Sequence, residues 1–212
     1  MRYNAEHVAA SRDALVRAAA RTFRERGYAG VGVDEVSKRA GMTSGSFYKH
    51  FGGKSDAFLE VVRAGIDRVA RRVRSVKSNN AKDPVGGWVN DFATLHSSKE
   101  HLRSTGLGCN LPTLSVEVAR ADGEAKRAFE ESINKALAEM ASGEPFDDED
   151  GRERAVAVLS VLTGAMAIAR GVKNPRTAQM ITESARRAAL LIAANALPDT
   201  PRSKIKWTPA EY

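Results

Sequence analysis

The sequence predicts an all-α protein in which a unit of short N-terminal helices precedes a domain of longer helices. Apolar residues recur at helical spacing through most of the chain, and the strict alternation typical of strands is scarce. Glycines also divide the N-terminal part into short segments, whereas longer apolar stripes follow it. We therefore expect one unit at 1–56, a second at 57–198 and a C-terminal tail at 199–212.

The first helix is expected over residues 11–26, because Leu15, Ala19 and Phe23 fall on one face at helical spacing. Gly27 follows directly, and glycine tolerates the left-handed conformation that commonly ends a helix. This helix supplies apolar surface that the two very short helices after it cannot supply for themselves.

Those two short helices are expected at about 33–40 and 44–50, separated by Gly41. Two helices joined by a tight glycine-containing turn form the helix-turn-helix pattern, whose second helix enters the DNA major groove. Phe47 can face the shared core, while the opposite face of the second helix carries small and basic residues: Ser44, Ser46, Lys49 and His50. Small residues let a helix approach base edges closely, so this face is the candidate for reading DNA.

The charge of the chain is compatible with that interpretation. The net charge is +7 and the sequence pI about 9.7, which favours an anionic partner, although many soluble proteins are simply basic. The single Cys109 excludes an intrachain disulfide and fits the cytosol. The uncharged run 155–169 is shorter than the roughly 20 residues of a bilayer span, so a buried helix, a cytoplasmic location and no membrane association are expected.

The segment AARTFRERGYAGVGVDEVSKRAGMTSGSFYKHFGGKSDAF resembles the DNA-binding domain of the TetR (tetracycline-repressor) family of bacterial transcription regulators. The resemblance covers about residues 12–60, through F-x-E-R-G-Y, V-x-x-V, A-G-x-x-x-G-x-x-Y-x-H-F and a following lysine. It implies an all-α homodimer on a near-palindromic operator in double-stranded DNA. The family's usual member is a repressor that a small molecule releases.

By position in the family motif, Ser44, Gly45 and Ser46 approach the bases. The same resemblance assigns mainly phosphate contacts to five further residues, with Lys49 and His50 also able to reach bases: Thr43, Tyr48, Lys49, His50 and Lys54. The chain departs from the family pattern at 31–32, where Val-Gly replaces a Thr/Ser pair, and at 52–53, where Gly-Gly replaces Pro-Ser or Pro-Asn. These departures affect the phosphate contacts and the start of the fourth helix.

The second unit is expected to contain helices at about 54–77, from Asp83-Pro84 onward, and at 123–141, 151–172 and 175–197, with a mixed segment at 106–121 interrupted by Pro112. The last two helices carry many small residues, which can reflect intrachain packing or, as the resemblance implies, a homodimer interface. These residues are Ala157, Ser160, Gly164, Ala167, Ala185, Ala188, Ala189 and Ala193.

By the family's usual arrangement, the middle helices of the chain would then form a pocket for an unknown small-molecule effector. An apolar or aromatic ligand is the expectation, since no cluster of buried charge stands out, although for each candidate taken alone an ordinary core position is the better interpretation. The candidates for its lining are Trp88, Phe92, Leu95, Cys109, Leu111, Leu114, Val118, Phe129, Ile133, Leu162 and Met166.

Cys109 has two interpretations. Its surroundings resemble a G-C-x-x-x-x-L-x-x-E motif of a family branch that includes sensors of electrophiles and oxidants. A thiol near a helix N-terminus can have a lowered pKa and react. The alternative is an inert buried cysteine.

Catalysis, a cofactor and a metal site are not expected. The sequence has no glycine-rich phosphate loop, zinc-type Cys/His cluster or G-x-S-x-G elbow. His96 and His101 lie in a polar stretch that predicts a solvated surface rather than a metal pair. The acidic run 147–150 precedes a helix, and its consecutive spacing does not suit a calcium loop. The ordered motif at 23–54 argues against two other classes of protein. These are a nonspecific DNA-coating protein and an enzyme or ligand carrier with a helical fold.

Overall fold

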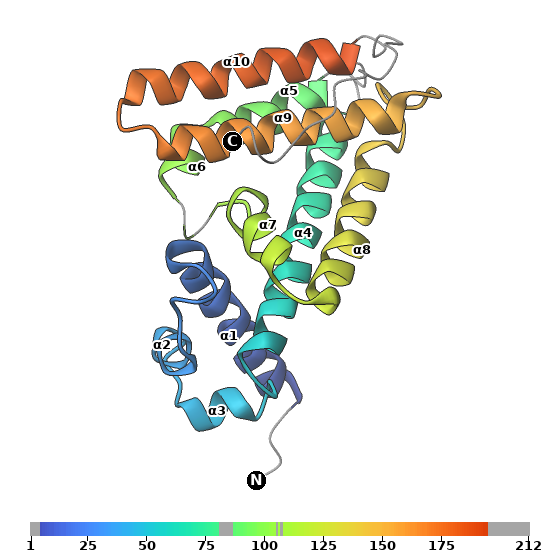
Figure 1. Ribbon diagram of the computed structural model, residues 1–212. Coiled ribbons are helices and arrows are strands. Elements are labelled where there is room, and N and C mark those ends of the chain that lie inside the picture. Colours follow the sequence, from blue (N-terminus) through green and yellow to red (C-terminus); the bar gives the residue numbers. More distant parts are fainter. Residues whose placement is uncertain (1–4, 81–86, 105, 107, 195–212) are drawn as a thin grey trace, which may run out of the picture.

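The computed structural model describes residues 5–80, 87–104, 106 and 108–194, and the described part of the chain is helical with no strand. One long helix, α4 (Lys54–Asn79), joins two ends of the molecule (Figure 1). Helices α1–α3 lie at one end of α4, and α5, α9 and α10 lie at the other (Figure 1). The all-α architecture and the N-terminal unit of three helices are therefore confirmed.

The N-terminal unit consists of α1 (Ala5–Arg26), α2 (Val33–Arg39) and α3 (Ser44–Tyr48). Phe23 and Phe47 are buried at its centre. Gly27 ends α1 with a φ of 74°, as expected, and the turn between α2 and α3 contains Gly41 with a φ of 71°. Both values lie in the left-handed region that only glycine adopts readily. The two glycines thus shape the turns that connect α1 to α2 and α2 to α3.

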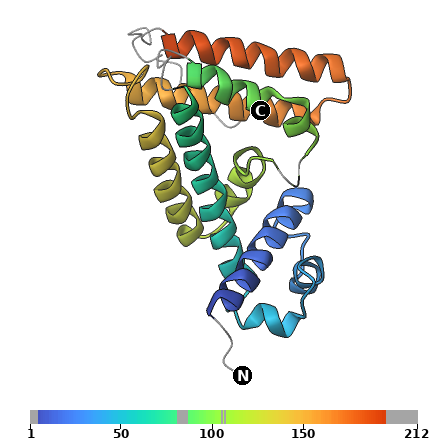
Figure 2. The same cartoon turned by 180° about the vertical axis from the view of Figure 1, so that it is seen from behind.

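Helix α4 packs along α8 (Gly123–Met140), and its first turns pack against α1 (Figure 2). Its apolar stripe is buried as the sequence predicts, with Val61, Val62, Ile66 and Val73 each at most 2% exposed. At the far end the Lys77 ammonium donates to the carbonyl oxygens of Glu139, Met140 and Ser142 in the last turn of α8 and just beyond. Helix α4 is therefore in contact with both units.

The far end is formed by α5 (Gly87–Ser97), α9 (Gly151–Gly171) and α10 (Pro175–Ala194), which pack on one another (Figure 1). Trp88 is buried here, and its indole N–H donates to the carbonyl oxygen of Glu144 at 2.9 Å. Arg154 of α9 is also buried and donates to the Ala193 carbonyl oxygen, while its guanidinium pairs with Asp148. The acidic run before α9 thus supplies a partner for a buried arginine.

Two short helices complete the fold, α6 (Lys99–Arg103) and α7 (Leu111–Arg120). Helix α6 was not predicted from the sequence. Pro112 was expected to interrupt the segment 106–121, whereas it lies in the first turn of α7. Proline is tolerated there because the amide it lacks would have no helical partner. Helix α1 also begins six residues earlier than expected. The predicted tail at 199–212 lies outside the described residues.

Among the described helices, α9 alone is long and apolar enough to cross a membrane by length and composition. Its side chains at 155, 158, 159, 162, 166 and 169 are buried within the protein, which is the pattern of a core helix. The prediction of a buried helix at 155–169 is therefore confirmed for one face of α9.

Helices α9 and α10 have a packed face with small residues and an outward face with large apolar side chains. Ala185, Ala189 and Ala193 are at most 7% exposed and pack inside the protomer, as the intrachain interpretation predicts. By contrast, α9 and α10 expose large apolar side chains: Val156 is 41% exposed, Ile168 61% and Met180 62%. The packed and the outward faces of these helices are thus distinct.

Candidate functional site

The first candidate site is the outer face of α3. Phe47 points into the core, while Thr43, Gly45, Tyr48 and Lys49 are exposed. Thr43 precedes the helix, and its hydroxyl oxygen accepts the backbone N–H of Ser46 at 3.2 Å. This cap fixes the start of a helix of only five residues.

The side chains of Ser44 and Ser46 in α3 contact residues of α2 and of the turn before α3. The Ser44 hydroxyl donates to the Asp34 carboxylate of α2, and the Ser46 hydroxyl lies 3.8 Å from the Met42 sulfur. Both serines are half-buried, and His50 likewise, whereas Tyr48 is 59% exposed. The residues expected at base edges and phosphates therefore lie on one small, solvent-accessible surface.

Lys54, the first residue of α4, has an internal role. Its ammonium donates to the carbonyl oxygens of Tyr28 and Val31, each at 3.1 Å, and lies 4.3 Å from the centre of the Tyr28 ring. These contacts use two of its three N–H donors. Lys54 thus joins α4 to the loop after α1 and retains one donor for a phosphate.

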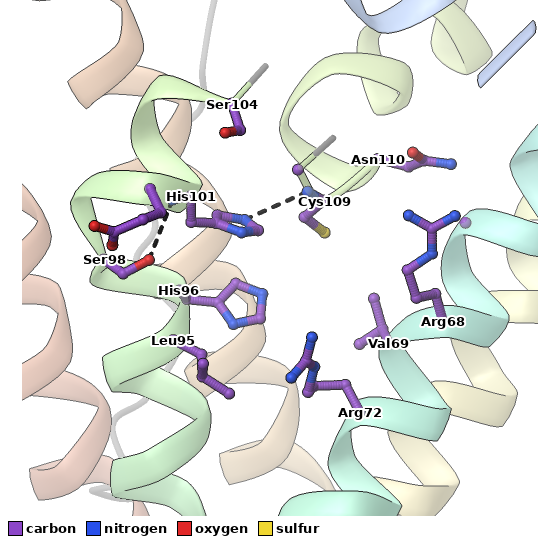
Figure 3. Close-up of a pocket in the computed structure, with 13 residues that line it drawn as sticks. Arg68, Val69, Arg72, Leu95, His96, Ser98, His101, Ser104, Cys109 and Asn110 are labelled. Carbon is purple, nitrogen blue, oxygen red and sulfur yellow. Dashed lines mark hydrogen bonds between the residues drawn. The ribbon is translucent and has the colours of Figure 1, made fainter. Parts of the chain in front are cut away.

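The second candidate site is a cavity of about 280 Å³ between α4, α5, α6 and the start of α7 (Figure 3). This volume is close to the lower end of the roughly 300–1,000 Å³ typical of small-molecule sites. In Figure 3, Arg68 and Arg72 extend from α4 on one side, and His96 and His101 lie on the other. The lining consists of Gly65, Arg68, Val69, Arg72, Leu95, His96, Ser98, Glu100, His101, Ser104, Gly108, Cys109 and Asn110.

The two histidines correct a prediction, because His96 is buried rather than solvated. Its Nδ1 donates to the Phe92 carbonyl oxygen at 3.0 Å, and its ring centre lies 5.2 Å from that of His101. Burial lowers the pKa of His96 to about 4, and Arg72 and Arg170 act in the same direction. The pKa of His101 is also lowered to about 4, mainly by burial and by His96. Both rings are therefore neutral at pH 7.

The surroundings of Cys109 bear on the two interpretations of its thiol. Burial raises the pKa of its thiol, and this effect exceeds the opposite influence of the Leu111 backbone N–H and of nearby arginines such as Arg170 and Arg24. Its backbone N–H donates to His101 Nε2 at 3.4 Å. Of the two interpretations, the raised pKa favours the inert cysteine, since desolvation of the thiolate dominates. The thiol nevertheless lines the cavity (Figure 3).

A buried polar link connects the wall of the cavity to α1. Arg24 of α1 is 4% exposed, and its guanidinium donates to the side-chain oxygen of Asn110 and to the Gly106 carbonyl oxygen. The Asn110 amide nitrogen donates in turn to the Val61 carbonyl oxygen of α4 at 2.9 Å. A side chain at Gly65 would overlap the Asn110 amide, so glycine is required there. One asparagine thus contacts α1, α4 and the cavity.

Only two of the predicted ligand-lining residues, Leu95 and Cys109, lie along this cavity. Leu111, Leu114 and Phe129 surround a narrow gap beside α4 that has no room for a water molecule. The others pack against the hydrophobic core, so their alternative interpretation as core describes them better: Trp88, Phe92, Val118, Ile133, Leu162 and Met166.

The polar lining was missed by sequence reasoning. Arg68 and Arg72 are one helical turn apart at the edge of the α4 stripe, and this spacing is visible in the sequence. Nothing local reveals that His96 and His101 face them, because that depends on the packing of α5 and α6 against α4. The described residues contain no group of three His, Cys, Asp or Glu side chains that could hold a metal.

The arrangement of α2, a glycine turn and a solvent-exposed α3 on a third helix is that of a helix-turn-helix DNA-binding domain. Residues 15–61 match the family model of bacterial regulatory proteins, tetR family. This match is confined to the N-terminal domain, which is therefore similar to the DNA-binding domain of the TetR family.

Similar proteins agree with this assignment. The chain is 30% identical over 108 residues to the HTH-type transcriptional repressor DhaR of Mycobacterium sp. (strain GP1), a match that covers 51% of this chain and 52% of that protein. The chain thus spans about half the length of this curated relative. A TetR-family regulator from Agrobacterium tumefaciens has a TM-score of 0.71 at 16% identity, covering 85% of this chain and 98% of that one. Regulatory protein TetR from Rhodobacter sphaeroides has a TM-score of 0.68 at 24% sequence identity, and the match covers 82% of this chain and 96% of that one. These two structures establish the fold.

Proposed function

We propose that the protein is a sequence-specific DNA-binding transcriptional regulator, and that it represses genes until an effector releases it from a palindromic operator. The observation that carries this proposal is the exposed face of α3 within a domain that matches the TetR family over residues 15–61. Small side chains at Ser44, Gly45 and Ser46 let the helix approach base edges. A cytoplasmic regulator, rather than an enzyme, fits this surface.

The groups around α3 would position the helix on the DNA backbone. Thr43, Tyr48 and Lys49 are exposed beside it and can donate hydrogen bonds to phosphate oxygens, and His50 lies next to them. Such contacts carry little sequence information and make binding depend on salt. Lys54 would contribute its third N–H donor while its other contacts hold α4 against the loop after α1.

We further propose a homodimer through α9 and α10. The exposed side chains of Val156, Ile168 and Met180 lie on these two helices, and burial of such apolar surface is the main source of association free energy. Two recognition helices must meet major grooves about one helical turn, roughly 34 Å, or a multiple of it apart. A dimer supplies the second helix that a near-palindromic operator requires.

Release is proposed to follow a two-state mechanism. A ligand in the cavity contacts Asn110, which holds Arg24 of α1 and Val61 of α4. If the ligand favours a conformation in which α4 moves, the recognition helices lose their spacing. The ligand must bind that state better by the coupling free energy, typically about 1–3 kcal/mol. Modification of Cys109 is a second candidate trigger, because the thiol lines the same cavity.

The proposal is tested by selecting bound duplexes from a random library with the purified protein. A near-palindromic motif with two half-sites should be enriched over successive rounds. A matched variant, Ser46→Glu with Lys49→Glu, places negative charge on the face of α3 and should enrich nothing. Enrichment of no motif by the folded wild-type protein would contradict sequence-specific recognition.

A further inference from the structure

The cavity has an unusual charge balance. Arg68 and Arg72 line it, and Arg170 lies behind Gly108, where its guanidinium donates to the His101 carbonyl oxygen at 3.2 Å and to the Thr113 hydroxyl at 3.4 Å. None of these three arginines forms an ion pair with a carboxylate of the described ranges. The cavity is therefore surrounded by positive charge that the described part of the protein leaves uncompensated.

The same excess continues beyond the cavity wall. Arg24 and Arg68 also line an open depression of about 380 Å³ between α1, the end of α2 and α4, together with Arg17, Arg21 and Arg39. Arg21 and Arg39 pair with Glu25 there, whereas Arg24 bonds only to neutral oxygens. The pKa of Arg24 is lowered to about 10, mainly by burial and in part by the positive charges of Arg68 and Arg170. Negative charge placed between these groups would relieve that repulsion.

The remaining lining defines what else an occupant must have. Glu100 is the only carboxylate of the lining among the described residues, and it is exposed to solvent. Val69 of α4 and Leu95 of α5 add apolar surface to the lining, and the neutral rings of His96 and His101 lie opposite the arginines (Figure 3). A free inorganic ion would leave this apolar and aromatic surface uncovered. An anionic group joined to a small apolar body would satisfy both parts.

We propose that this cavity binds a small organic acid, with its carboxylate between Arg68 and Arg72 and its apolar body against Val69 and Leu95. Two guanidinium groups one helical turn apart provide paired N–H donors that match the two oxygens of a carboxylate. The lining thus specifies an anionic ligand, in place of the apolar or aromatic compound that the sequence predicts.

The role of this acid as the effector rests on the proposed function. Asn110 lines the cavity that the acid would occupy, so binding of the acid can alter the hydrogen bond between Arg24 and Asn110. A change in this hydrogen bond would affect the position of α1. Binding to the cavity and release of DNA are separate measurements. A protein that never binds an operator would overturn the proposed function without affecting the binding site.

The binding site is tested by calorimetry on the free protein with matched pairs of acids and neutral amides at millimolar concentration. Suitable pairs are benzoate and benzamide, cinnamate and cinnamamide, and hexanoate and hexanamide. At least one acid should bind at least about tenfold more tightly than its amide, since the charge-assisted hydrogen bonds are lost in the amide. Equal binding within every pair, or no binding of any acid, would overturn the proposal.

Variants locate the site. Arg68→Gln with Arg72→Gln should weaken binding of that acid by at least about tenfold. Arg63→Gln with Arg71→Gln removes the same charge from exposed positions outside the cavity, and should leave the affinity within about twofold. Leu95→Trp, which fills the cavity without changing its charge, should also abolish binding. An acid that still binds the first variant, or is lost from the second, does not occupy this cavity.

The effector role is tested on DNA. An acid that binds the cavity should weaken binding of the wild-type protein to its selected duplex by about fivefold or more. The matched amide should have no effect, and the Arg68→Gln, Arg72→Gln variant should bind the duplex but not respond to the acid. An acid that binds the cavity and leaves DNA affinity unchanged would overturn the effector role.

Discussion

Gly65→Ala is the sharpest test of the link between the cavity and the DNA-binding domain. An added Cβ would overlap the amide of Asn110, so the asparagine must leave its position. The change then removes the Asn110 hydrogen bonds to Arg24 and to Val61. We expect a lower stability and a DNA affinity that no longer responds to a ligand in the cavity.

The magnitude follows from those two bonds. A buried hydrogen bond to a charged group contributes about 1.5–3 kcal/mol, and a neutral one about 0.5–1.5 kcal/mol. Alanine offsets about 0.5–1 kcal/mol of this loss, because it is the better helix former. The net loss is about 1–4 kcal/mol, and a loss near its middle lowers Tm by roughly 5–10 °C in a protein of this size.

The assay is thermal unfolding followed by circular dichroism, with Gly164→Ala in α9 as the matched control. A Cβ added at Gly164 has no neighbour within 4 Å in the protomer. This control should therefore be unchanged or more stable by up to about 1 kcal/mol. Both proteins are compared at a concentration where their association state equals that of the wild type. A Gly65→Ala protein as stable as this control would refute the assigned role of Asn110.

Three further predictions follow from the site and the outward helix faces. The pKa of His96 is lowered to about 4 in the folded protein, whereas in the unfolded chain it is about 6.5. As the pH falls, His96 therefore becomes protonated in the unfolded chain before it does in the folded protein, and stability is lost between about pH 6.5 and pH 4. His96 alone should account for about 2 kcal/mol of the stability lost between pH 7 and pH 5, and His101 adds to the loss; chemical denaturation should show this loss, and His96→Gln should reduce it. Since the pKa of the Cys109 thiol is raised, N-ethylmaleimide should modify it at least about tenfold more slowly in the folded than in the urea-unfolded protein, by mass spectrometry; equal rates would show an accessible, reactive thiol. Ile168→Glu with Met180→Glu should give a folded monomer in sedimentation velocity, and an unchanged dimer would place the interface elsewhere.

Much of the fold could be predicted from the sequence because it depends on local signals. The apolar stripe of α4 recurs with helical periodicity, which predicts the helix. Gly27 and Gly41 have positive φ values and lie at the ends of helices, where glycine is expected. Helix α6 was missed because its five residues carry no apolar periodicity; its start depends on a cap in which Ser98 accepts the His101 N–H. Short helices of this kind are set by caps and tertiary contacts rather than by pattern.

The two candidate sites differ in how far the sequence reveals them. The α3 surface lies in one contiguous stretch, so its exposed residues could be named from spacing and from the family resemblance. The cavity is assembled from helices far apart in sequence, and its chemistry appears only when Arg72 is seen opposite His96 (Figure 3). The same packing surrounds the Cys109 thiol and raises its pKa, which distinguishes between two interpretations that the sequence left open.

Sequence-specific binding of duplex DNA by the protein can be measured by fluorescence anisotropy. Labelled duplexes would tile the DNA beside the protein's own gene and include any sequence recovered by selection, with a scrambled duplex as reference, across a salt series. We expect tight binding to one duplex, with a preference over the scrambled sequence that survives at physiological salt. Equal, salt-sensitive binding to every duplex, the selected sequence included, would contradict it.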